Sequence, residues 1–322
     1  MNRGSIANLV RVCIQTNRDA YGKTFSNPAK LEPSTSINPQ LIFRMSAIRR
    51  VVVTGIGVVT PLGSDCATTW ARLIAGESGL IPLPADHLQG LPGLDRKPIP
   101  PGLLHGGPAP QAALTGDHVT GELIIDLAVH AANEAVADAR AINGFDVDPY
   151  RMGVVFGTSK GGLRSYERFA RSLEGEPGED SARFWQQFFS DTPALTLARE
   201  YDCRAAALCP VAACATGLIA VQQAADLIHE DRCDVILAGS SDASLLPIFQ
   251  ASFQRLGVLA RNFTDPASAC RPFDEFREGF LVGEGAAVLV LEELEHARSR
   301  GVTPSAEWLG GGVAADTTGL TQ

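Results

Sequence analysis

The chain has 322 residues, of which 45% are hydrophobic and 20% are charged, and its net charge is −9. This composition is typical of a soluble globular protein with one large or two smaller domains, and acidic charge without a basic cluster argues against nucleic-acid binding. No apolar stretch approaches the roughly 20 residues of a membrane-spanning helix. Seven cysteines, an odd number without short paired spacings, indicate reduced thiols, and we therefore expect a cytoplasmic location.

The sequence predicts neither a metal site nor a cofactor site. The cysteines form no Cys-x-x-Cys pair, and no paired histidines accompany them to complete a tetrahedral zinc site. Gly55 and Gly57 resemble the start of a dinucleotide-binding fingerprint, but Thr60 stands where the third glycine is needed. We therefore reject a dinucleotide-binding loop.

The first 44 residues differ in character from the rest of the chain. They are basic, poor in acidic residues and without a long apolar core, which excludes a secretory signal. Met45 is followed by a basic and then a β-branched run, as at a natural start. We expect residues 1–44 to be a disordered extension or a misassigned start, and an organelle transit peptide is the less favoured alternative.

Strands and helices alternate along the remaining chain. A β-branched run predicts a buried strand at 50–55, followed by a turn-rich loop at 54–63 and a helix that begins near Ser64 or Asp65 and stops at Gly76. A long loop rich in proline and glycine follows. The later elements are a helix at 123–139, a strand at 152–157, a polar helix ending near Leu173, and strands at 205–211, 234–239, 284–291 and 305–310. This order predicts an α/β fold with a mixed, mostly parallel sheet.

Cys214 is the candidate catalytic residue. It lies between the apolar run 205–211, which suits a buried strand, and the helical pattern of residues 215–230. At a helix N-terminus, the exposed N–H groups and the helix dipole favour a thiolate, and a free backbone N–H can face a substrate oxygen. The small neighbours Ala212, Ala213, Ala215 and Gly217 leave room for a substrate.

A lone cysteine is more often a small buried hydrophobic residue than a nucleophile. The strand, the turn and the helix around Cys214 raise the case for catalysis. The helix after Cys214 is apolar around most of its circumference, and such a helix needs cover on two sides.

Five sequence blocks carry a resemblance to a known family. They are Arg49-Arg-Val-Val-Val-Thr-Gly-Ile-Gly-Val-Val-Thr-Pro-Leu-Gly63, residues 153–163, Ala212-Ala-Cys-Ala-Thr-Gly217, residues 234–239, and the stretch from Arg271-Pro-Phe-Asp to Gly301. With them the chain resembles the N-terminal half of a β-ketoacyl-acyl-carrier-protein synthase of the elongating type, in the thiolase-like superfamily. The resemblance implies that Cys214 is the nucleophile of an acyltransferase and accepts an acyl chain as a thioester.

The resemblance also implies a domain organisation. Residues 45–301 would form the synthase N-terminal domain, and residues 302–322 the truncated beginning of the C-terminal half. In the family, that half supplies two histidines that help decarboxylate the malonyl donor, and a lysine and a Phe-Gly-Phe-Gly loop that complete the site. None of the six histidines here matches those positions, and we expect surface or cap roles for them. They are His87, His105, His118, His130, His229 and His296.

The family fold stacks two similar halves as α-β-α-β-α layers, of which this chain would form the first. We therefore expect a partner: a complementary C-terminal-half chain, a second copy as in the family's homodimers, or both. The substrates implied are acyl and malonyl thioesters of acyl carrier protein, in fatty-acid or polyketide biosynthesis.

Three points stay open at the level of the sequence. The main alternative function is a catalytically inactive, truncated ketosynthase-like scaffold or dimerisation subunit, and a redox-sensing thiol is a further possibility. Lys160 occupies a loop position that is often apolar in relatives and lies near their acyl pocket. If Lys160 points inward, a long fatty chain is disfavoured, whereas an outward Lys160 has no such meaning.

Overall fold

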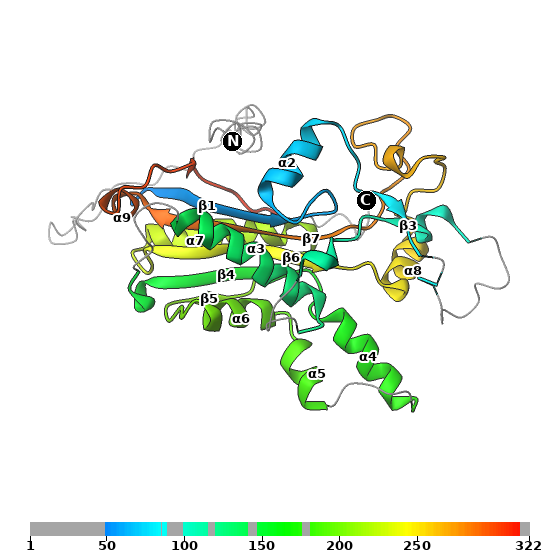
Figure 1. Cartoon of the computed structure of the whole chain (residues 1–322), viewed down its shortest axis with the longest axis horizontal. Coiled ribbons are helices and arrows are strands. Elements are labelled where there is room, and N and C mark those ends of the chain that lie inside the picture. Colours follow the sequence, from blue (N-terminus) through cyan, green and yellow to red (C-terminus); the bar gives the residue numbers. More distant parts are fainter. Residues whose placement is uncertain are drawn as a thin grey trace, which may run out of the picture.

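The computed structural model describes residues 49–84, 86–88, 99–114, 120–140, 147–175 and 181–315. The expectations for residues 1–44 and for His118 therefore lie outside the described residues. A six-stranded sheet in the order β5-β4-β6-β7-β1-β8 forms the centre (Figure 1). Its strands are β1 (Val51–Val59), β4 (Met152–Thr158), β5 (Ala207–Leu208), β6 (Val235–Ala243), β7 (Glu284–Glu293) and β8 (Ala306–Trp308).

The sheet is mixed, but it is not mostly parallel. Strand β4 runs parallel to β5 and β6, whereas the pairs β6–β7, β7–β1 and β1–β8 are antiparallel. The prediction of a mostly parallel sheet was wrong on this point. Apolar runs report that a strand is buried on both faces, and central strands of either direction share that property.

Helices cover both faces of the sheet. Helices α3 (Leu123–Arg140) and α6 (Thr192–Glu200) pack with β4, β6 and β7 in one apolar core. Helix α7 (Thr216–His229) packs on the opposite face, where Ala220, Ala224 and Ile228 are fully buried against the sheet. The three layers confirm the α/β prediction and place α7 on a face of its own.

Strand β1 continues through the segment that the sequence predicted as a loop. Gly55 and Gly57 remain in the strand because both pair with β7, and α3 crosses close above them. A Cβ atom at Gly57 would lie 1.9 Å from the Ala131 carbonyl oxygen, and one at Gly55 would lie 2.1 Å from that of Ala135. These glycines therefore allow a helix to approach a strand, and they do not form a phosphate-binding turn.

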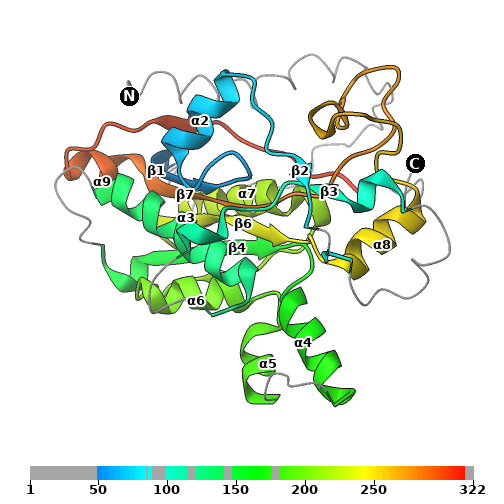
Figure 2. The same ribbon diagram turned by 45° about the vertical axis from the view of Figure 1, so that its right-hand side comes forward.

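The smaller helices surround this core. Helix α2 (Cys66–Ile74) begins as predicted, since the Asp65 carboxylate accepts a hydrogen bond from the Thr68 N–H at 2.7 Å. Gly76 follows its end with φ +73°. Helices α4 (Leu163–Leu173) and α5 (Ser181–Gln187) project from the body (Figure 2), α8 (Pro247–Leu256) follows β6, and α9 (Leu294–Ser299) follows β7.

Two short strands lie within the long proline- and glycine-rich segment. Strands β2 (Ile81–Pro82) and β3 (His105–Gly106) pair antiparallel apart from the main sheet. Among the described helices, none is long and apolar enough to cross a membrane.

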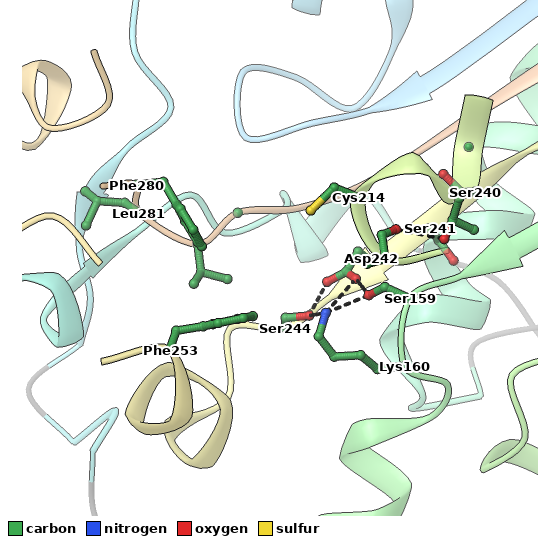
Figure 3. Close-up of a pocket in the computed structure, with 15 residues that line it drawn as sticks. Ser159, Lys160, Cys214, Ser240, Ser241, Asp242, Ser244, Phe253, Phe280 and Leu281 are labelled. Atoms are coloured by element: carbon green, nitrogen blue, oxygen red, sulfur yellow. Dashed lines mark hydrogen bonds and ion pairs between the residues drawn. The ribbon is translucent and has the colours of Figure 1, made fainter. Parts of the chain in front are cut away.

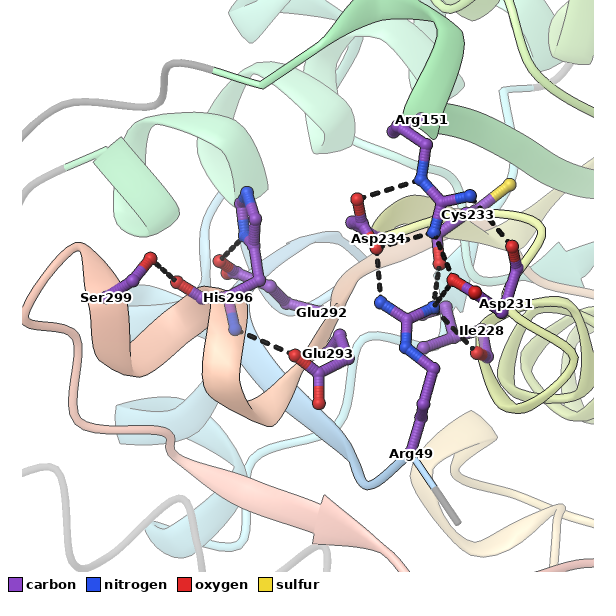
Figure 4. Close-up of polar contacts among 10 residues, drawn as sticks. All are labelled: Arg49, Arg151, Ile228, Asp231, Cys233, Asp234, Glu292, Glu293, His296 and Ser299. Atoms are coloured by element: carbon purple, nitrogen blue, oxygen red, sulfur yellow. Dashed lines mark hydrogen bonds and ion pairs between the residues drawn. The ribbon is translucent and has the colours of Figure 1, made fainter. Parts of the chain in front are cut away.

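An ion-pair cluster fixes the end of the sheet opposite Cys214. The Asp234 carboxylate, just before β6, accepts hydrogen bonds from the guanidinium groups of Arg151, before β4, and Arg49, before β1 (Figure 4). The Arg151 contact, with help from Arg49, lowers the pKa of Asp234 to about 2 against the opposing effect of burial. Asp231 also pairs with Arg151, at 2.6 Å. Three strand ends are thereby held together.

Candidate active site

Cys214 lies in a single turn of 3-10 helix, Ala213–Ala215, directly before α7. The helix predicted at residues 215–230 is present, but the buried strand predicted at residues 205–211 is not. Only Ala207 and Leu208 form a strand, and both are exposed at the sheet edge. Pro210 has no N–H to donate, and β5 has β4 as its single described neighbour, so the remaining apolar residues form an irregular connection.

A buried hydroxyl holds the Cys214 turn in shape. The Ala212 N–H donates to Thr216 Oγ1 at 2.9 Å, and the same hydroxyl donates to the Ala213 carbonyl oxygen at 2.7 Å. Ala213 has φ +48°, a backbone conformation that is unfavourable for a residue with a Cβ. In the described part of the chain, the N–H of Cys214 donates to no other residue. The turn therefore presents a thiol beside an unused backbone donor.

Two glycines bring this turn close to the sheet. A Cβ at Gly157, in β4, would lie 2.3 Å from the Pro210 carbonyl oxygen and 2.4 Å from Thr216 Cγ2. A Cβ at Gly217 would lie 2.7 Å from the hydroxyl of Ser240 in β6. The sequence indicated that Gly217 makes room for substrate. Gly217 does line the pocket, yet much of the space it leaves is taken by Ser240.

Cys214 differs from the other described cysteines in its exposure. It is exposed, whereas the remaining ones are buried or half-buried. Burial raises the pKa of Cys66 and Cys203 to about 12, and it raises the pKa of Cys209 and Cys233 as well. The interpretation of Cys214 as a small buried hydrophobic residue is therefore wrong.

Cys214 opens into a pocket of about 380 Å³. Its sulfur points into this space, with Phe280 and Phe253 across from it (Figure 3). The two rings meet edge to face, with centroids 5.7 Å apart. The other lining residues are Ser159, Lys160, Ala213, Thr216, Gly217, Ser240, Ser241, Asp242, Ser244, Leu281, Val282 and Gly283. The pocket thus has an aromatic side and a polar side.

Lys160 points into this pocket. Its ammonium group donates to Ser159 Oγ at 2.6 Å, to Ser244 Oγ at 2.9 Å and to Asp242 Oδ2 at 3.2 Å. The Ser159 and Ser244 hydroxyls also donate to the Asp242 carboxylate. Sequence reasoning raised Lys160 but missed Asp242 and the serines. The available signal was their position at the carboxyl ends of β4 and β6, because the carboxyl ends of parallel neighbours meet at one edge.

Histidine is absent from the described pocket lining. His105 and His130 contact the carbonyl oxygens of Pro101 and Ser64, which agrees with the expected surface or cap roles. His87 contacts the buried Gln250 instead. His296 pairs with the fully buried Glu292 at 2.6 Å, so a cap role alone does not describe it.

Comparison with known proteins identifies the family of this fold and site. The model of the β-ketoacyl synthase N-terminal domain matches residues 48–297. The chain belongs to the β-ketoacyl synthase family. The matched region contains the Cys214 turn, Lys160 with its hydrogen-bond partners, and both pocket aromatics.

Individual relatives agree with this assignment. The chain is 37% identical to the ketoacyl synthase alpha subunit of the tetracenomycin polyketide synthase of Streptomyces glaucescens, over 81% of this chain and 62% of that protein. It is 31% identical to 3-oxoacyl-[acyl-carrier-protein] synthase 2 of Coxiella burnetii, over 85% of this chain and 65% of that protein.

The fold comparison gives a matching result. A type II polyketide ketosynthase, solved in complex with its acyl-carrier protein and bound to a hexaketide, aligns with a TM-score of 0.64 and 29% identity. The alignment covers 80% of this chain and 62% of that one. The chain thus spans less than two thirds of the length of these relatives. Over the aligned part it has the thiolase-like fold of the synthases.

Proposed function

We propose that Cys214 accepts an acyl group from the thioester of an acyl carrier protein, as the first step of a β-ketoacyl synthase reaction. The Cys214 sulfur attacks the thioester carbonyl carbon, a new carbon–sulfur bond forms, and the bond to the carrier's thiol breaks. The proton that leaves Cys214 balances the thiolate that departs with the carrier. No oxidant or reductant is required.

One observation carries this proposal: the exposed thiol opens into the pocket from a turn whose own N–H is unused. An N–H beside the sulfur can donate to the carbonyl oxygen as negative charge develops on it. A thiol that served only for packing would be covered by its neighbours. Cys233 is buried and Cys66 and Cys203 are half-buried in this way, whereas Cys214 is exposed. The comparisons lend no support to the inactive scaffold considered from the sequence.

The second half of the reaction requires further groups. Decarboxylation of a malonyl thioester and Claisen condensation with the Cys214-bound acyl group use histidines in the family, and the described pocket lining contains no histidine. We assign these groups to a complementary C-terminal half, acting in either fatty-acid or polyketide synthesis. The acyl transfer to Cys214 and the condensation are therefore separable steps.

Exposed apolar side chains beside Cys214 and α7 support an additional covering partner. Leu218, on the outer side of α7, is 72% exposed, and Val211 before the turn is also exposed. Leu309 and Val313 are exposed in the segment after β8, which passes close to Gln222 of α7. Such a group of apolar residues is typical of a protein interface. A complementary half or a second copy of the chain would cover them.

Intact-mass spectrometry tests the acyl transfer. The full chain is incubated with an acyl thioester, and the expected result is a mass increase of one acyl group. Cys214→Ser should abolish this increase. Cys209→Ser is the matched control, because this half-buried cysteine lies five positions from Cys214 and should leave the increase intact. An unmodified wild-type chain, with and without a complementary C-terminal half, would contradict the proposal.

A further inference from the structure

The pocket beside Cys214 contains a closed polar cluster, defined here as Ser159, Lys160, Asp242 and Ser244. Three hydrogen-bond acceptors surround the Lys160 ammonium group, and they use its three hydrogens. Both Asp242 oxygens accept serine hydroxyls, so the hydrogens of Ser159 and Ser244 are used as well. The cluster is electrically neutral, and its hydrogen-bond donors are satisfied within it.

The oxygen atoms of the same cluster can still accept further hydrogen bonds. Each serine oxygen accepts one hydrogen bond from Lys160, which leaves a lone pair free, and the carboxylate oxygens of Asp242 hold several. The Asp242 side chain is 38% exposed, so these lone pairs are reachable from the pocket. A ligand group that donates a hydrogen bond can therefore bind here without breaking the existing contacts.

The aromatic residues of the pocket restrict where such a ligand can lie. Phe253 lies beside the polar cluster, with its ring centre 5.7 Å from the Lys160 ammonium, and Phe280 meets Phe253 edge to face. A chain that extends from Cys214 therefore passes along these aromatic rings and reaches the polar cluster next to them (Figure 3). The pocket therefore suits a chain that is apolar in part and carries a polar substituent.

We propose that the acyl group accepted by Cys214 carries a hydroxyl that donates to the polar cluster, in preference to a saturated alkyl chain. This inference rests on the acyl transfer proposed above and defines its substrate class. A saturated chain would displace water from the cluster and return no hydrogen bond, and such unpaired polar groups penalise an apolar ligand. A carbonyl substituent would also be disfavoured, because it needs a donor where the donors are already used.

The test compares acylation rates for three thioesters of equal chain length: hexanoyl, 5-hydroxyhexanoyl and 5-oxohexanoyl N-acetylcysteamine. Each is incubated with the full chain, and acylation of Cys214 is followed by mass spectrometry. We expect the hydroxyacyl thioester to react about tenfold faster than the hexanoyl thioester, the factor of one net hydrogen bond. The oxo thioester should behave like the hexanoyl one.

A double variant assigns the preference to the polar cluster. Lys160→Met together with Asp242→Asn removes one charge of each sign at nearly constant volume, and the rate ratio should fall towards one. Arg171→Met with Glu167→Gln is the matched control, because this pair is an ion pair on α4 outside the pocket lining. It should retain the wild-type ratio.

The outcomes separate this inference from the acyl transfer itself. Equal rates, or a preference for the hexanoyl or oxo thioester in the wild-type chain, would overturn the hydroxyacyl inference and leave Cys214 as the acyl acceptor. Failure of every thioester to acylate Cys214 would instead overturn the acyl transfer, and the inference with it. If the double variant does not fold, the wild-type ratio alone decides.

Discussion

The conformation of the Cys214 turn depends on one hydroxyl group. Thr216 is 3% exposed, and its side chain links the Ala212 N–H to the Ala213 carbonyl. A buried polar group that loses its partner costs about 1–3 kcal/mol. The unfavourable φ of Ala213 means that this turn needs such support.

Thr216→Val should therefore weaken both the fold and the acyl transfer. Valine keeps the shape of threonine, but the half-buried Ala212 N–H loses its acceptor, and the Ala213 carbonyl keeps only the Thr216 N–H as a donor. The free energy of unfolding should therefore fall by about 1 kcal/mol. The acylation rate of Cys214 should fall as well, because the turn is no longer fixed. Denaturant unfolding and the acylation assay measure the two effects.

Thr196→Val, on the half-buried side of α6, is the control, because the Thr196 hydroxyl makes no hydrogen bond to a described residue. Unchanged stability and acylation in the Thr216 variant would show that the hydroxyl does not position the nucleophile.

Sequence reasoning reached Cys214 but not its surroundings. The helical pattern after Cys214 and its small neighbours are local signals, and the helix begins at Thr216, one residue after the predicted start at Ala215. Lys160 and Asp242 are 82 positions apart, and only the pairing of β4 with β6 brings them together. The polar cluster therefore depends on strand order, which apolar patterns do not specify.

At the scale of elements, the close approach of α3 to β1 leaves no room for a side chain at Gly55 or Gly57. Strand β1 extends through both glycines because it pairs with β7 as far as Val59. Beyond Val53, β8 no longer pairs with β1, and carboxylates of α3 accept the free strand N–H groups. Glu134 accepts from Val58 at 2.9 Å, and Asp138 accepts from Ile56 at 3.2 Å.

Gly57→Ala should disrupt this contact. The added Cβ would lie 1.9 Å from a backbone oxygen of α3, so the helix has to move away from the sheet. Overpacking of this kind costs about 1–3 kcal/mol, which denaturant unfolding can measure. Gly312→Ala is the matched control, because nothing lies within 4 Å of a Cβ at that position. A Gly57 variant as stable as the control would contradict the packing described here.

At the scale of the whole molecule, the end of the sheet opposite Cys214 carries a buried charge cluster that titrates with pH. Glu292, in β7, is fully buried and pairs with Arg300 at 2.7 Å and with His296 at 2.6 Å. Burial opposes ionisation, yet these contacts lower the pKa of Glu292 to about 2. The Glu292 carboxylate in turn raises the pKa of His296 above its usual value.

These shifts predict how stability depends on pH. Protonated His296 stabilises the fold through its pair with Glu292. This contribution to the free energy of unfolding should be fully present below about pH 6.5 and should decline as pH rises through the raised pKa of His296. The ionised Glu292 carboxylate should contribute to the free energy of unfolding above its usual pKa of 4.5, and this contribution should be lost as pH falls towards 2.

His296→Gln tests the first of these contributions. The difference in unfolding free energy between the wild type and His296→Gln should shrink from pH 6 to pH 9. A difference that is constant over this range would contradict the ion pair.

The proposed role of Cys214 as acyl acceptor can be measured at the residue itself. The chain is digested after reaction with an acyl thioester, and the modified peptide is mapped by mass spectrometry. The acyl group should be bound to Cys214 and should be released by hydroxylamine, as a thioester is. An acyl group on another cysteine, or on none, would rule out this role for Cys214.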